Sequence, residues 1–278
     1  MAEDLLVARG IEVTYGGRRG PFGGPGHKVL HGVDFSIRRG ETVGIVGESG
    51  SGKTTFGRAL LKLVDVSAGE IRFDGADITH LPDSRMRPLR RRMQMIFQDP
   101  MASLNPRHSI RRILIEPILF HGLARDAREA EARVWKILDR FTLPAAVLDR
   151  NPHELSGGQR QRIGIARAAL LEPDFVLADE IVSGLDVSTQ ALVLNLLKDL
   201  SRDLGLALAF ISHDLSVIRA VCDRVYVMRF GKVIEEGPCE QVFAAPKSNY
   251  TRALLDAIPL PEIDPEWLMR ESLVDETQ

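Results

Sequence analysis

The chain has 278 residues, of which 44% are hydrophobic and 27% charged, and its formal net charge at pH 7 is −2. This composition is typical of a folded globular chain, and the length suffices for one large domain with a substantial core. The near-neutral charge argues against a general nucleic-acid binder, which is normally clearly basic.

The first third of the chain predicts short strands around a long loop. Residues 5–13 and 33–37 alternate apolar and polar side chains, as half-buried strands do. Between them, residues 16–28 contain six glycines and two prolines and are expected to form a mobile hairpin loop. Residues 42–46 predict a compact apolar strand, and a helix is expected from about Lys53 to Val64. Two further strands are predicted at residues 71–73 and 93–97.

The middle of the chain predicts helices. Val134, Leu138 and Phe141 follow helical spacing within residues 126–141, with charged side chains on the other face. Residues of about 99–169 are therefore expected to form a helical subdomain. It would be inserted into a strand–helix core of about 1–98 and 170–261, which completes a domain over residues 1–261.

The last third predicts a parallel sheet. Residues 175–178 and 206–211 are almost entirely apolar, which suits strands covered on both faces, and a helix is predicted between them at 189–204. Residues 262–278 carry six acidic residues against one arginine and are expected to be a loosely held acidic tail.

Cysteines and signals for targeting are sparse. Cys222 and Cys239 lack the CxxC spacing of a zinc site and provide no disulfide framework, which fits a reducing cytosol. The N-terminus has no apolar signal core, and the most apolar run, residues 204–211, is too short to cross a bilayer. Any role at a membrane is therefore expected to depend on a partner.

Residues 47–54, GESGSGKT, fit the phosphate-loop pattern GxxxxGK[ST] between a predicted strand and a predicted helix. Glycines let the backbone curl so that its N–H groups point at phosphate oxygens, and the helix dipole adds positive potential. Lys53 is expected to reach the β and γ phosphates, and Thr54 to bind Mg²⁺. The expected nucleotide contacts are Gly47, Glu48, Ser49, Gly50, Ser51, Gly52, Lys53, Thr54 and Thr55.

Polar side chains follow three of the predicted strands. Asp179 and Glu180 follow the strand at 175–178: Asp179 is expected to hold Mg²⁺, and Glu180 to polarise the water that attacks the γ-phosphate. His213 and Gln98 also come just after strands. Because ligands bind at the carboxyl ends of parallel strands, His213 is expected to contact the γ-phosphate.

One further stretch, ELSGGQRQR at residues 154–162, carries no nucleophile and no metal ligand of its own. Together with the phosphate loop, Gln98, Asp179-Glu180, Ser183–Asp186 and His213 in this order, it resembles the nucleotide-binding subunit of ABC transporters from about Leu5 to Pro261. The resemblance implies an α/β P-loop NTPase with a mostly parallel sheet core, an N-terminal antiparallel β subdomain and an inserted helical subdomain. The implied activity is ATP hydrolysis with Mg²⁺.

The resemblance also assigns roles to single residues around the nucleotide. Tyr15 matches the aromatic residue that stacks on adenine, although a lone tyrosine on a strand also fits a place in the core. Gln98 matches the glutamine that contacts Mg²⁺ and senses the membrane partner. His213 matches the switch histidine, and the catalytic set is Glu180, His213 and Gln98.

The remaining motif residues match features that act between two subunits. Ser156, Gly158 and Gln159 match the signature that closes on the γ-phosphate of ATP held by the facing subunit, with the helix expected to begin near Gln159. Asp186 matches a loop that crosses the dimer interface. ATP would then join two subunits and hydrolysis would release them.

Two positions depart from the family pattern. Ile181 stands where proline is usual, and Gly184 stands where alanine is commonest. Neither change removes a functional group, so activity is expected to survive. Gly184 is expected to loosen the backbone before Asp186.

Longer phrases are similar to a subgroup of the family. Residues 93–107, 151–168 and 249–259 resemble the ATPase subunits of dipeptide and oligopeptide importers, and nickel, opine and glutathione importers share much of this wording. The implied partners are two transmembrane permease subunits, a second ATPase subunit, identical or related, and indirectly an extracytoplasmic substrate-binding protein. The implied location is peripheral, at the cytoplasmic face of the inner (plasma) membrane.

A different class remains open. Soluble ABC ATPases act in DNA repair, chromosome structure or translation, and the basic run at residues 85–92 invites that interpretation. Those proteins typically carry a second cassette, a coiled-coil insertion or zinc-binding cysteines, which this sequence lacks. A P-loop kinase would have no use for LSGGQ. The basic run is therefore interpreted as a solvated face, and no nucleic-acid partner is expected.

Overall fold

The computed structural model describes residues 4–16 and 26–257. The centre of the expected hairpin loop and the expected acidic tail therefore lie outside the described residues. Four strands form an antiparallel sheet in the order β2-β1-β4-β5. They are β1 (Asp4–Tyr15), β2 (His27–Arg38), β4 (Ala68–Phe73) and β5 (Ala76–Asp77).

A second sheet has six strands in the order β10-β9-β3-β8-β7-β6. They are β3 (Thr42–Val46), β6 (Met93–Ile96), β7 (Phe175–Asp179), β8 (Ala207–Ile211), β9 (Arg224–Arg229) and β10 (Lys232–Pro238). Strands β9, β3, β8, β7 and β6 run parallel, and β10 is antiparallel to β9. The mostly parallel core and the N-terminal antiparallel sheet predicted from the sequence are confirmed.

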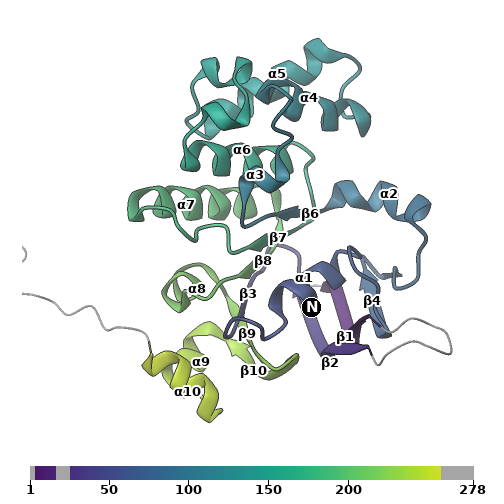
Figure 1. Cartoon of the computed structure of the whole chain (residues 1–278), viewed down its shortest axis with the longest axis vertical. Helices are drawn as coiled ribbons and strands as arrows, with labels where there is room; N and C mark the ends of the chain where they lie inside the picture. Colours follow the sequence, from purple (N-terminus) through teal and green to yellow (C-terminus); the bar gives the residue numbers. More distant parts are fainter. Residues whose placement is uncertain (1–3, 17–25, 258–278) are drawn as a thin grey trace, which may run out of the picture.

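Helices connect and cover these strands (Figure 1). They are α1 (Lys53–Leu60), α2 (Asp83–Arg92), α3 (Pro100–Ser103), α4 (Ile110–Phe120), α5 (Ala127–Arg140), α6 (Gly157–Ala169), α7 (Val187–Leu204), α8 (Leu215–Val221), α9 (Cys239–Ala244) and α10 (Asn249–Asp256). Two short 3-10 turns, Ala145–Asp149 and Pro152–Glu154, precede α6. Within residues 4–16 and 26–257, none of the helices combines the length and the hydrophobicity that a bilayer-spanning segment requires.

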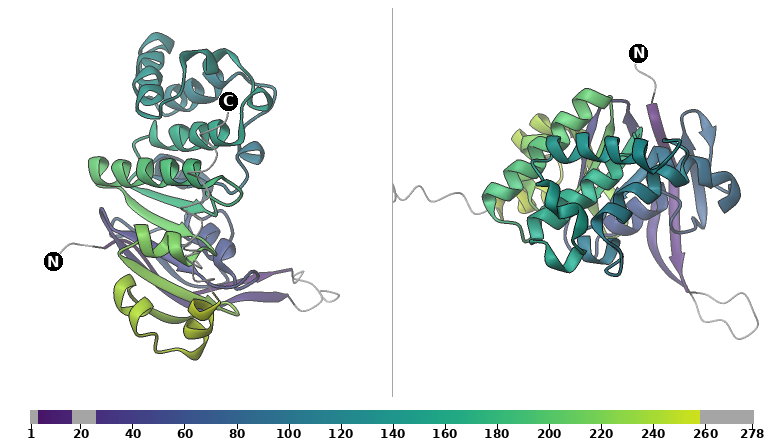
Figure 2. Two further views of the ribbon diagram at one scale, coloured as in Figure 1. Left: turned by 90° about the vertical axis from the view of Figure 1, so that its left-hand side faces the viewer. Right: turned by 90° about the horizontal axis from the view of Figure 1, so that it is seen from above.

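Both faces of the six-stranded sheet are covered, and neighbouring residues of one strand face opposite sides. Ile45 packs with α1 and the antiparallel sheet, whereas Val46 packs with α7, α8 and α9 on the other side. This two-sided burial explains why β3, β7 and β8 are apolar throughout. Helices α4, α5 and α6 lie together at the end of the molecule away from the antiparallel sheet (Figures 1 and 2).

Helix α1 ends four residues before the predicted Val64. Lys62 has a left-handed φ of 54°, and the Leu63 N–H donates to the carbonyl of Arg58, as at a helix C-terminus with a left-handed cap. Glycine usually occupies this position, and a lysine there does not signal the end of a helix. The Arg90 side chain donates to the carbonyls of Leu61 (2.5 Å) and Lys62 (3.0 Å), which satisfies acceptors that the helix leaves open.

The basic run at 85–92 forms helix α2, and its interpretation as merely a solvated face is wrong at its end. Arg92 pairs with Asp74 at 2.6 Å and also with Asp174. Arg39 pairs with the same two carboxylates, at 2.7 and 3.1 Å. These arginines join the antiparallel sheet to the segment that enters β7, because each binds a carboxylate from both regions.

Candidate functional site

The phosphate loop lies between β3 and α1, as predicted. Three of its glycines have positive φ: Gly47 (146°), Gly50 (79°) and Gly52 (100°). A Cβ atom on Gly47 would lie 2.1 Å from the carbonyl oxygen of Met228, so no larger residue fits there. The glycines are therefore required by backbone curvature and by the close approach of β9.

Lys53 begins α1, and its side chain turns back over the loop. Its Nζ donates to the carbonyls of Gly47 (2.8 Å) and Glu48 (2.9 Å), and the residue is only 6% exposed. Burial lowers the pKa of Lys53, and the carboxylates of Glu180 and Asp179 partly counteract this. Both present acceptors are neutral carbonyls, so an anionic phosphate oxygen would be the stronger partner for this ammonium.

A hydroxyl and a carboxylate meet beside Lys53. The Thr54 Oγ1 donates to Asp179 Oδ1 at 3.2 Å, and Asp179 is 5% exposed. Burial raises the pKa of Asp179, and the hydrogen bond from Thr54 acts against it. This oxygen pair fits Mg²⁺, which binds through one or two protein groups plus phosphate and water oxygens. The described residues contain no cluster of three or more histidine, cysteine or acidic side chains that could hold a metal ion.

Glu180 stands at the centre of the second predicted group. Its carboxylate accepts a hydrogen bond from Gln98 Nε2 at 3.0 Å, and His213 Nδ1 lies 3.6 Å from the same oxygen. Its own N–H donates to the carbonyl of Ile211, so Glu180 stays attached to β8 just beyond the end of β7. The structure thus brings together the side chains that follow β6, β7 and β8, which the sequence placed at one sheet edge.

The backbone at Glu180 has a left-handed φ of 48°, which is uncommon for a residue with a side chain. Ser183 stabilises this turn, since its hydroxyl donates to the Glu180 carbonyl at 2.8 Å. Ile181, which stands where proline is usual, is buried in the apolar core. Gly184 has a φ of 74°, in the region that favours glycine, and a Cβ there would contact nothing within 4 Å.

The signature stretch forms the N-terminus of α6, which begins at Gly157, two residues earlier than predicted. Ser156 is the N-cap, because its hydroxyl accepts the Gln159 N–H at 3.3 Å while the Gln159 side chain accepts the Ser156 N–H at 3.1 Å. Ser156 and Gly157 are exposed. The positive end of this helix therefore faces outward, as an anion-binding cap requires.

Asp186 caps the next helix, α7, beside the signature. It accepts the Thr189 N–H at 2.9 Å and the hydroxyls of Thr189 (2.7 Å) and Ser188 (2.5 Å). These bonds hold the pKa of Asp186 well below its usual range, and the bond from Ser188 contributes most. A Cβ on Gly158 would lie 2.8 Å from Thr189 Cγ2, so the signature and the Asp186 turn are packed together.

Among the described residues, Tyr15 makes no side-chain hydrogen bond to the phosphate loop or to Glu180. It ends β1 opposite His27 of β2, and it is 42% exposed. The alternative that this tyrosine belongs to the core is therefore wrong. An exposed ring at the end of a strand is available for stacking.

Two contacts to the phosphate loop were not foreseen from the sequence. The Gly231 N–H donates to the Ser51 carbonyl at 2.9 Å, and the Glu48 N–H donates to the Tyr250 hydroxyl at 3.0 Å. Both partners come from the end of the chain, after β9. Local sequence patterns carry no signal for pairs so far apart.

The loop before α1 and the acidic pair at the end of β7, at the carboxyl edge of a mostly parallel sheet, define a P-loop NTPase. A sequence profile of the ABC transporter family matches residues 30–183. Among curated relatives, a Brucella ovis protein named as a peptide import ATP-binding protein is 53% identical over 94% of this chain and 80% of its own length. The oligopeptide transport ATP-binding protein OppF of Bacillus subtilis is 45% identical over 96% of this chain and 86% of its own length.

Among solved structures, the dimeric post-hydrolysis state of the ATP-binding cassette MJ0796, bound to ADP and Pi, matches with a TM-score of 0.75. It is 28% identical, and the match covers 84% of this chain and 98% of the cassette. The chain belongs to the ABC transporter family and is an ATPase of that family. The resemblance to the group of peptide importer ATPases is confirmed.

Proposed function

We propose that this chain hydrolyses ATP to power a membrane importer of di- and oligopeptides. The observation that carries the proposal is the group around Glu180, in which Gln98 and His213 converge on one carboxylate beside Lys53 and Asp179. The names of the relatives, which refer to peptide and oligopeptide import, support the substrate class.

The side chains suggest a division of labour during hydrolysis. Lys53 neutralises phosphate charge, and Glu180 accepts a proton from the attacking water. The amide of Gln98 fixes the orientation of the Glu180 carboxylate, and His213, whose Nδ1 lies 3.6 Å from this carboxylate, would contact the γ-phosphate. Thr54, Asp179 and Gln98 would hold Mg²⁺, which stabilises charge developing on the phosphate oxygens.

The active unit in this proposal is a pair of ATPase subunits, identical or related. Ser156, Gly158 and Gln159 of one subunit would cap the nucleotide bound at Lys53 of the other, with Asp186 beside the junction. The exposed N-terminus of α6 supports this arrangement, because its positive end faces outward rather than into its own core. Tyr15 would stack on the adenine ring.

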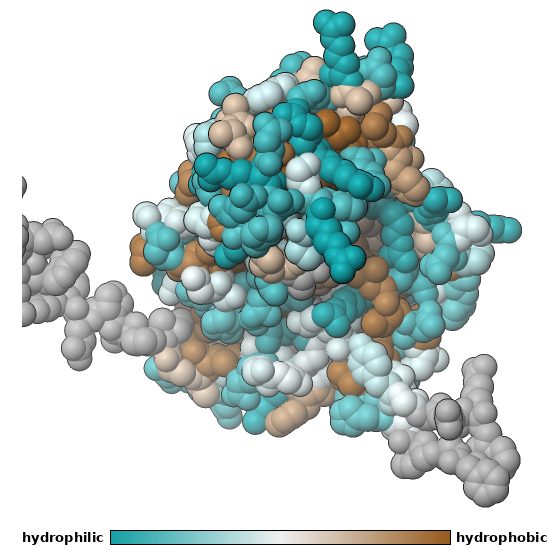
Figure 3. All heavy atoms as spheres, turned by 45° about the horizontal axis from the view of Figure 1, so that its top comes forward, coloured by the Kyte–Doolittle hydropathy of each residue, from teal (hydrophilic) through white to brown (hydrophobic). Residues whose placement is uncertain are grey.

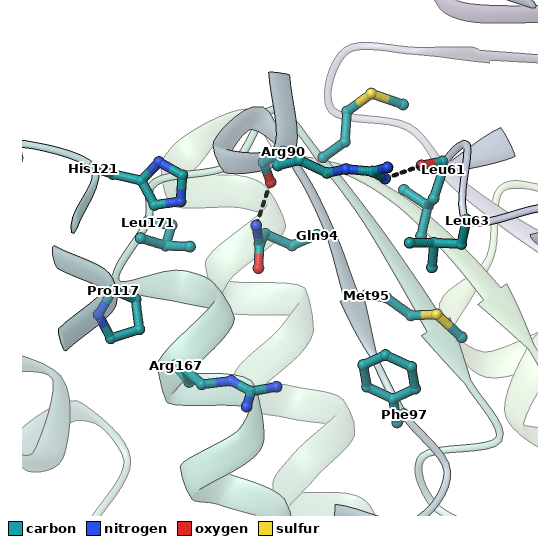
Figure 4. A pocket seen from close by; sticks show the side chains of 11 residues that line it. Leu61, Leu63, Arg90, Gln94, Met95, Phe97, Pro117, His121, Arg167 and Leu171 are labelled. Carbon is teal, nitrogen blue, oxygen red and sulfur yellow. Dashed lines mark hydrogen bonds between the residues drawn. The ribbon is translucent and has the colours of Figure 1, made fainter. Parts of the chain in front are cut away.

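A groove beside the site supports contact with a permease. It has a volume of about 340 Å³, and Met95 and Phe97 lie across it from Pro117 and His121 (Figure 4). Phe97 directly precedes Gln98, so a segment bound in this groove would press on the residue that touches Glu180. Pro117 and His121 also line a second hollow along α4.

The lining of the two hollows indicates what kind of segment fits. Arg90 and Arg167 bring positive charge, and burial lowers the pKa of Arg167. Exposed Leu119 and Phe120 add apolar surface nearby. In Figure 3, where the top of the Figure 1 view comes forward, brown hydrophobic patches lie among mainly hydrophilic residues. A permease segment with apolar and acidic side chains would match both properties.

The remaining parts of the proposal follow from this docking. Two transmembrane permease subunits would bind a pair of ATPases at the cytoplasmic face of the inner membrane, and an extracytoplasmic binding protein would deliver the peptide. The ATPase core would comprise about residues 1–98 and 170–261. The inserted helical subdomain, about 99–169, would form one wall of the groove.

The catalytic assignment is tested with Glu180→Gln. This variant is expected to bind ATP and to form ATP-dependent dimers, while its hydrolysis rate falls by about 100-fold or more because the proton acceptor is lost. Glu240→Gln, at an exposed glutamate of α9, is the matched control and should retain full activity. Full ATPase activity in Glu180→Gln would show that Glu180 is not the base.

The transport assignment is tested in native membranes. Affinity capture of the Glu180→Gln chain with ATP is expected to recover two permeases, an ATPase partner and a substrate-binding protein. Uptake of labelled dipeptides, compared with Ni²⁺ and glutathione, then identifies the substrate. Recovery of nucleic acid without a permease would favour the soluble class of ABC ATPases instead.

A further inference from the structure

The phosphate loop is hydrogen-bonded from outside by two segments that follow β9 in the sequence. Tyr250, in the first turn of α10, is 9% exposed, and its hydroxyl accepts the Glu48 N–H at 3.0 Å. The turn between β9 and β10 adds the bond from the Gly231 N–H to the Ser51 carbonyl. Two segments that follow β9 thus bind two different points of one loop.

The bond to Tyr250 fixes the direction of a backbone donor. Phosphate loops bind anions because successive N–H groups point inward. Here the Glu48 N–H donates to the Tyr250 hydroxyl of α10. The Lys53 ammonium binds the carbonyls of Gly47 and Glu48. Because the C=O and N–H of one trans peptide unit point in opposite directions, the Glu48 N–H points away from the Lys53 side chain. The peptide unit between Gly47 and Glu48 is therefore held on both sides, by Lys53 at its carbonyl and by Tyr250 at its N–H.

Other contacts fix Tyr250 itself. The guanidinium of Arg229 lies 4.6 Å from the centre of the Tyr250 ring and 4.9 Å from that of Phe230. Arg229 ends β9, and Phe230 belongs to the turn that carries Gly231. The two grips on the loop are thereby joined through one arginine.

The start of α10 is fixed by a buried carboxylate. Glu235 of β10 accepts the N–H groups of Lys247 (2.8 Å) and Ser248 (3.0 Å), just before the helix. Farther along, Leu254 and Leu255 of α10 pack toward Val46, the residue before the phosphate loop. Helix α10 is thus seated on the same strand end from which the loop departs.

We propose that Tyr250 is a positioning residue of the phosphate loop, through which the docking of α10 and the binding of ATP stabilise each other. The inference rests on the proposed binding of ATP at Lys53. Coupling of this kind is reciprocal: if docking of α10 strengthens ATP binding, ATP must stabilise the docked helix by the same factor.

The test compares Tyr250→Phe with Tyr226→Phe in the full chain. Both variants keep the aromatic ring and remove a hydroxyl that accepts a backbone N–H. In Tyr226 that donor is the Ser36 N–H, at 3.1 Å and outside the phosphate loop. Loss of one such bond at the loop is expected to raise the Kd for a non-hydrolysable ATP analogue about 3- to 10-fold in Tyr250→Phe only. The KM for ATP should rise by the same factor, with kcat nearly unchanged.

Hydrogen exchange supplies a readout that loss of stability alone would not mimic. Exchange of the Glu48 amide should become faster in Tyr250→Phe and stay unchanged in Tyr226→Phe. In the wild-type chain, the analogue should slow exchange of the α10 amides.

An unchanged Kd in Tyr250→Phe, or α10 exchange that ignores the nucleotide, would overturn the inference while leaving the proposed function intact. A drop in melting temperature without a change in Kd would likewise assign Tyr250 a purely structural role. A wild-type chain that binds no nucleotide would overturn both proposals.

Discussion

The phosphate loop and the signature stretch are both glycine-rich approaches to a helix, but the chain treats them in opposite ways. The loop before α1 has no side-chain cap and is supported by Gly231 and Tyr250 from the end of the chain. The signature before α6 closes its own cap through Ser156 and Gln159 and remains exposed. In the proposed function, the loop that binds ATP is thus supported by residues distant in sequence, whereas the signature that would meet another subunit caps its own helix and stays exposed.

Replacing Lys53 should have the largest effect on ATPase activity, because it removes the positive charge from the phosphate loop. Lys53→Ala is expected to lower ATPase activity by at least about 100-fold, since a preorganised charge at the phosphates is lost. The rate is measured at saturating ATP, with Lys232→Ala, at an exposed lysine of β10, as the control. Near-normal ATPase activity in Lys53→Ala would show that Lys53 does not act on the bound phosphates.

Ser156→Arg places a bulky side chain at the exposed signature before α6. It should abolish ATP-dependent dimerisation and hydrolysis while nucleotide binding at Lys53 persists. Mixing Lys53→Ala chains with Ser156→Arg chains sharpens the comparison. If sites are shared between two copies of this chain, random pairing leaves about one quarter of the sites intact, and activity returns to about that level. If each chain used its own signature, the mixture would stay inactive.

The charge of Asp186 should contribute a smaller, pH-dependent effect at the same surface. Its depressed pKa means that the folded state favours the ionised form, so this stability is present above the ordinary aspartate pKa and disappears as the pH falls through the folded value. Asp186→Asn is therefore expected to be less stable at pH 7, with a difference that shrinks below about pH 4. Urea unfolding of both chains from pH 7 to pH 3 measures it, and a constant difference would contradict the assignment.

The smallest effect concerns the packing of the signature against α7. A Cβ on Gly158 would lie 2.8 Å from Thr189 Cγ2, whereas one on Gly157 would contact nothing within 4 Å. Gly158→Ala should therefore cost about 1 kcal/mol of unfolding free energy, and Gly157→Ala almost none. Adding Thr189→Ser, which removes the clashing methyl group and keeps the hydroxyl, should restore Gly158→Ala. Equal costs for the two alanines would show that this contact does not matter.

Local patterns sufficed to predict the features that depend on neighbouring residues. The phosphate loop, the apolar strands β7 and β8 and the helix at 126–141 have periodicity or motif spacing within a few residues. The meeting of Gln98, Glu180 and His213 also followed, because each comes after a parallel strand and such strand ends share one edge.

The features that were missed depend on distant residues or on unusual backbone angles. The end of α1 relies on a left-handed Lys62, and the supports of the phosphate loop come from Gly231 and Tyr250. Phrases that include Tyr250 resembled relatives, yet the resemblance carried no role for its hydroxyl. The packing of Gly158 on Thr189 likewise appears only when two helix starts are placed side by side.

The strand order of the larger sheet has a consequence for how the protein is made. Strand β3 leads into the phosphate loop, but its two neighbours are β8 and β9, which are synthesised much later. A growing chain on the ribosome must therefore carry β3 with both edges unpaired until residues 207–229 have emerged. Nucleotide binding is thus among the last properties that the nascent chain acquires. A product truncated before β9 would expose one unpaired edge of β3 and would be prone to aggregation rather than weakly active as an ATPase.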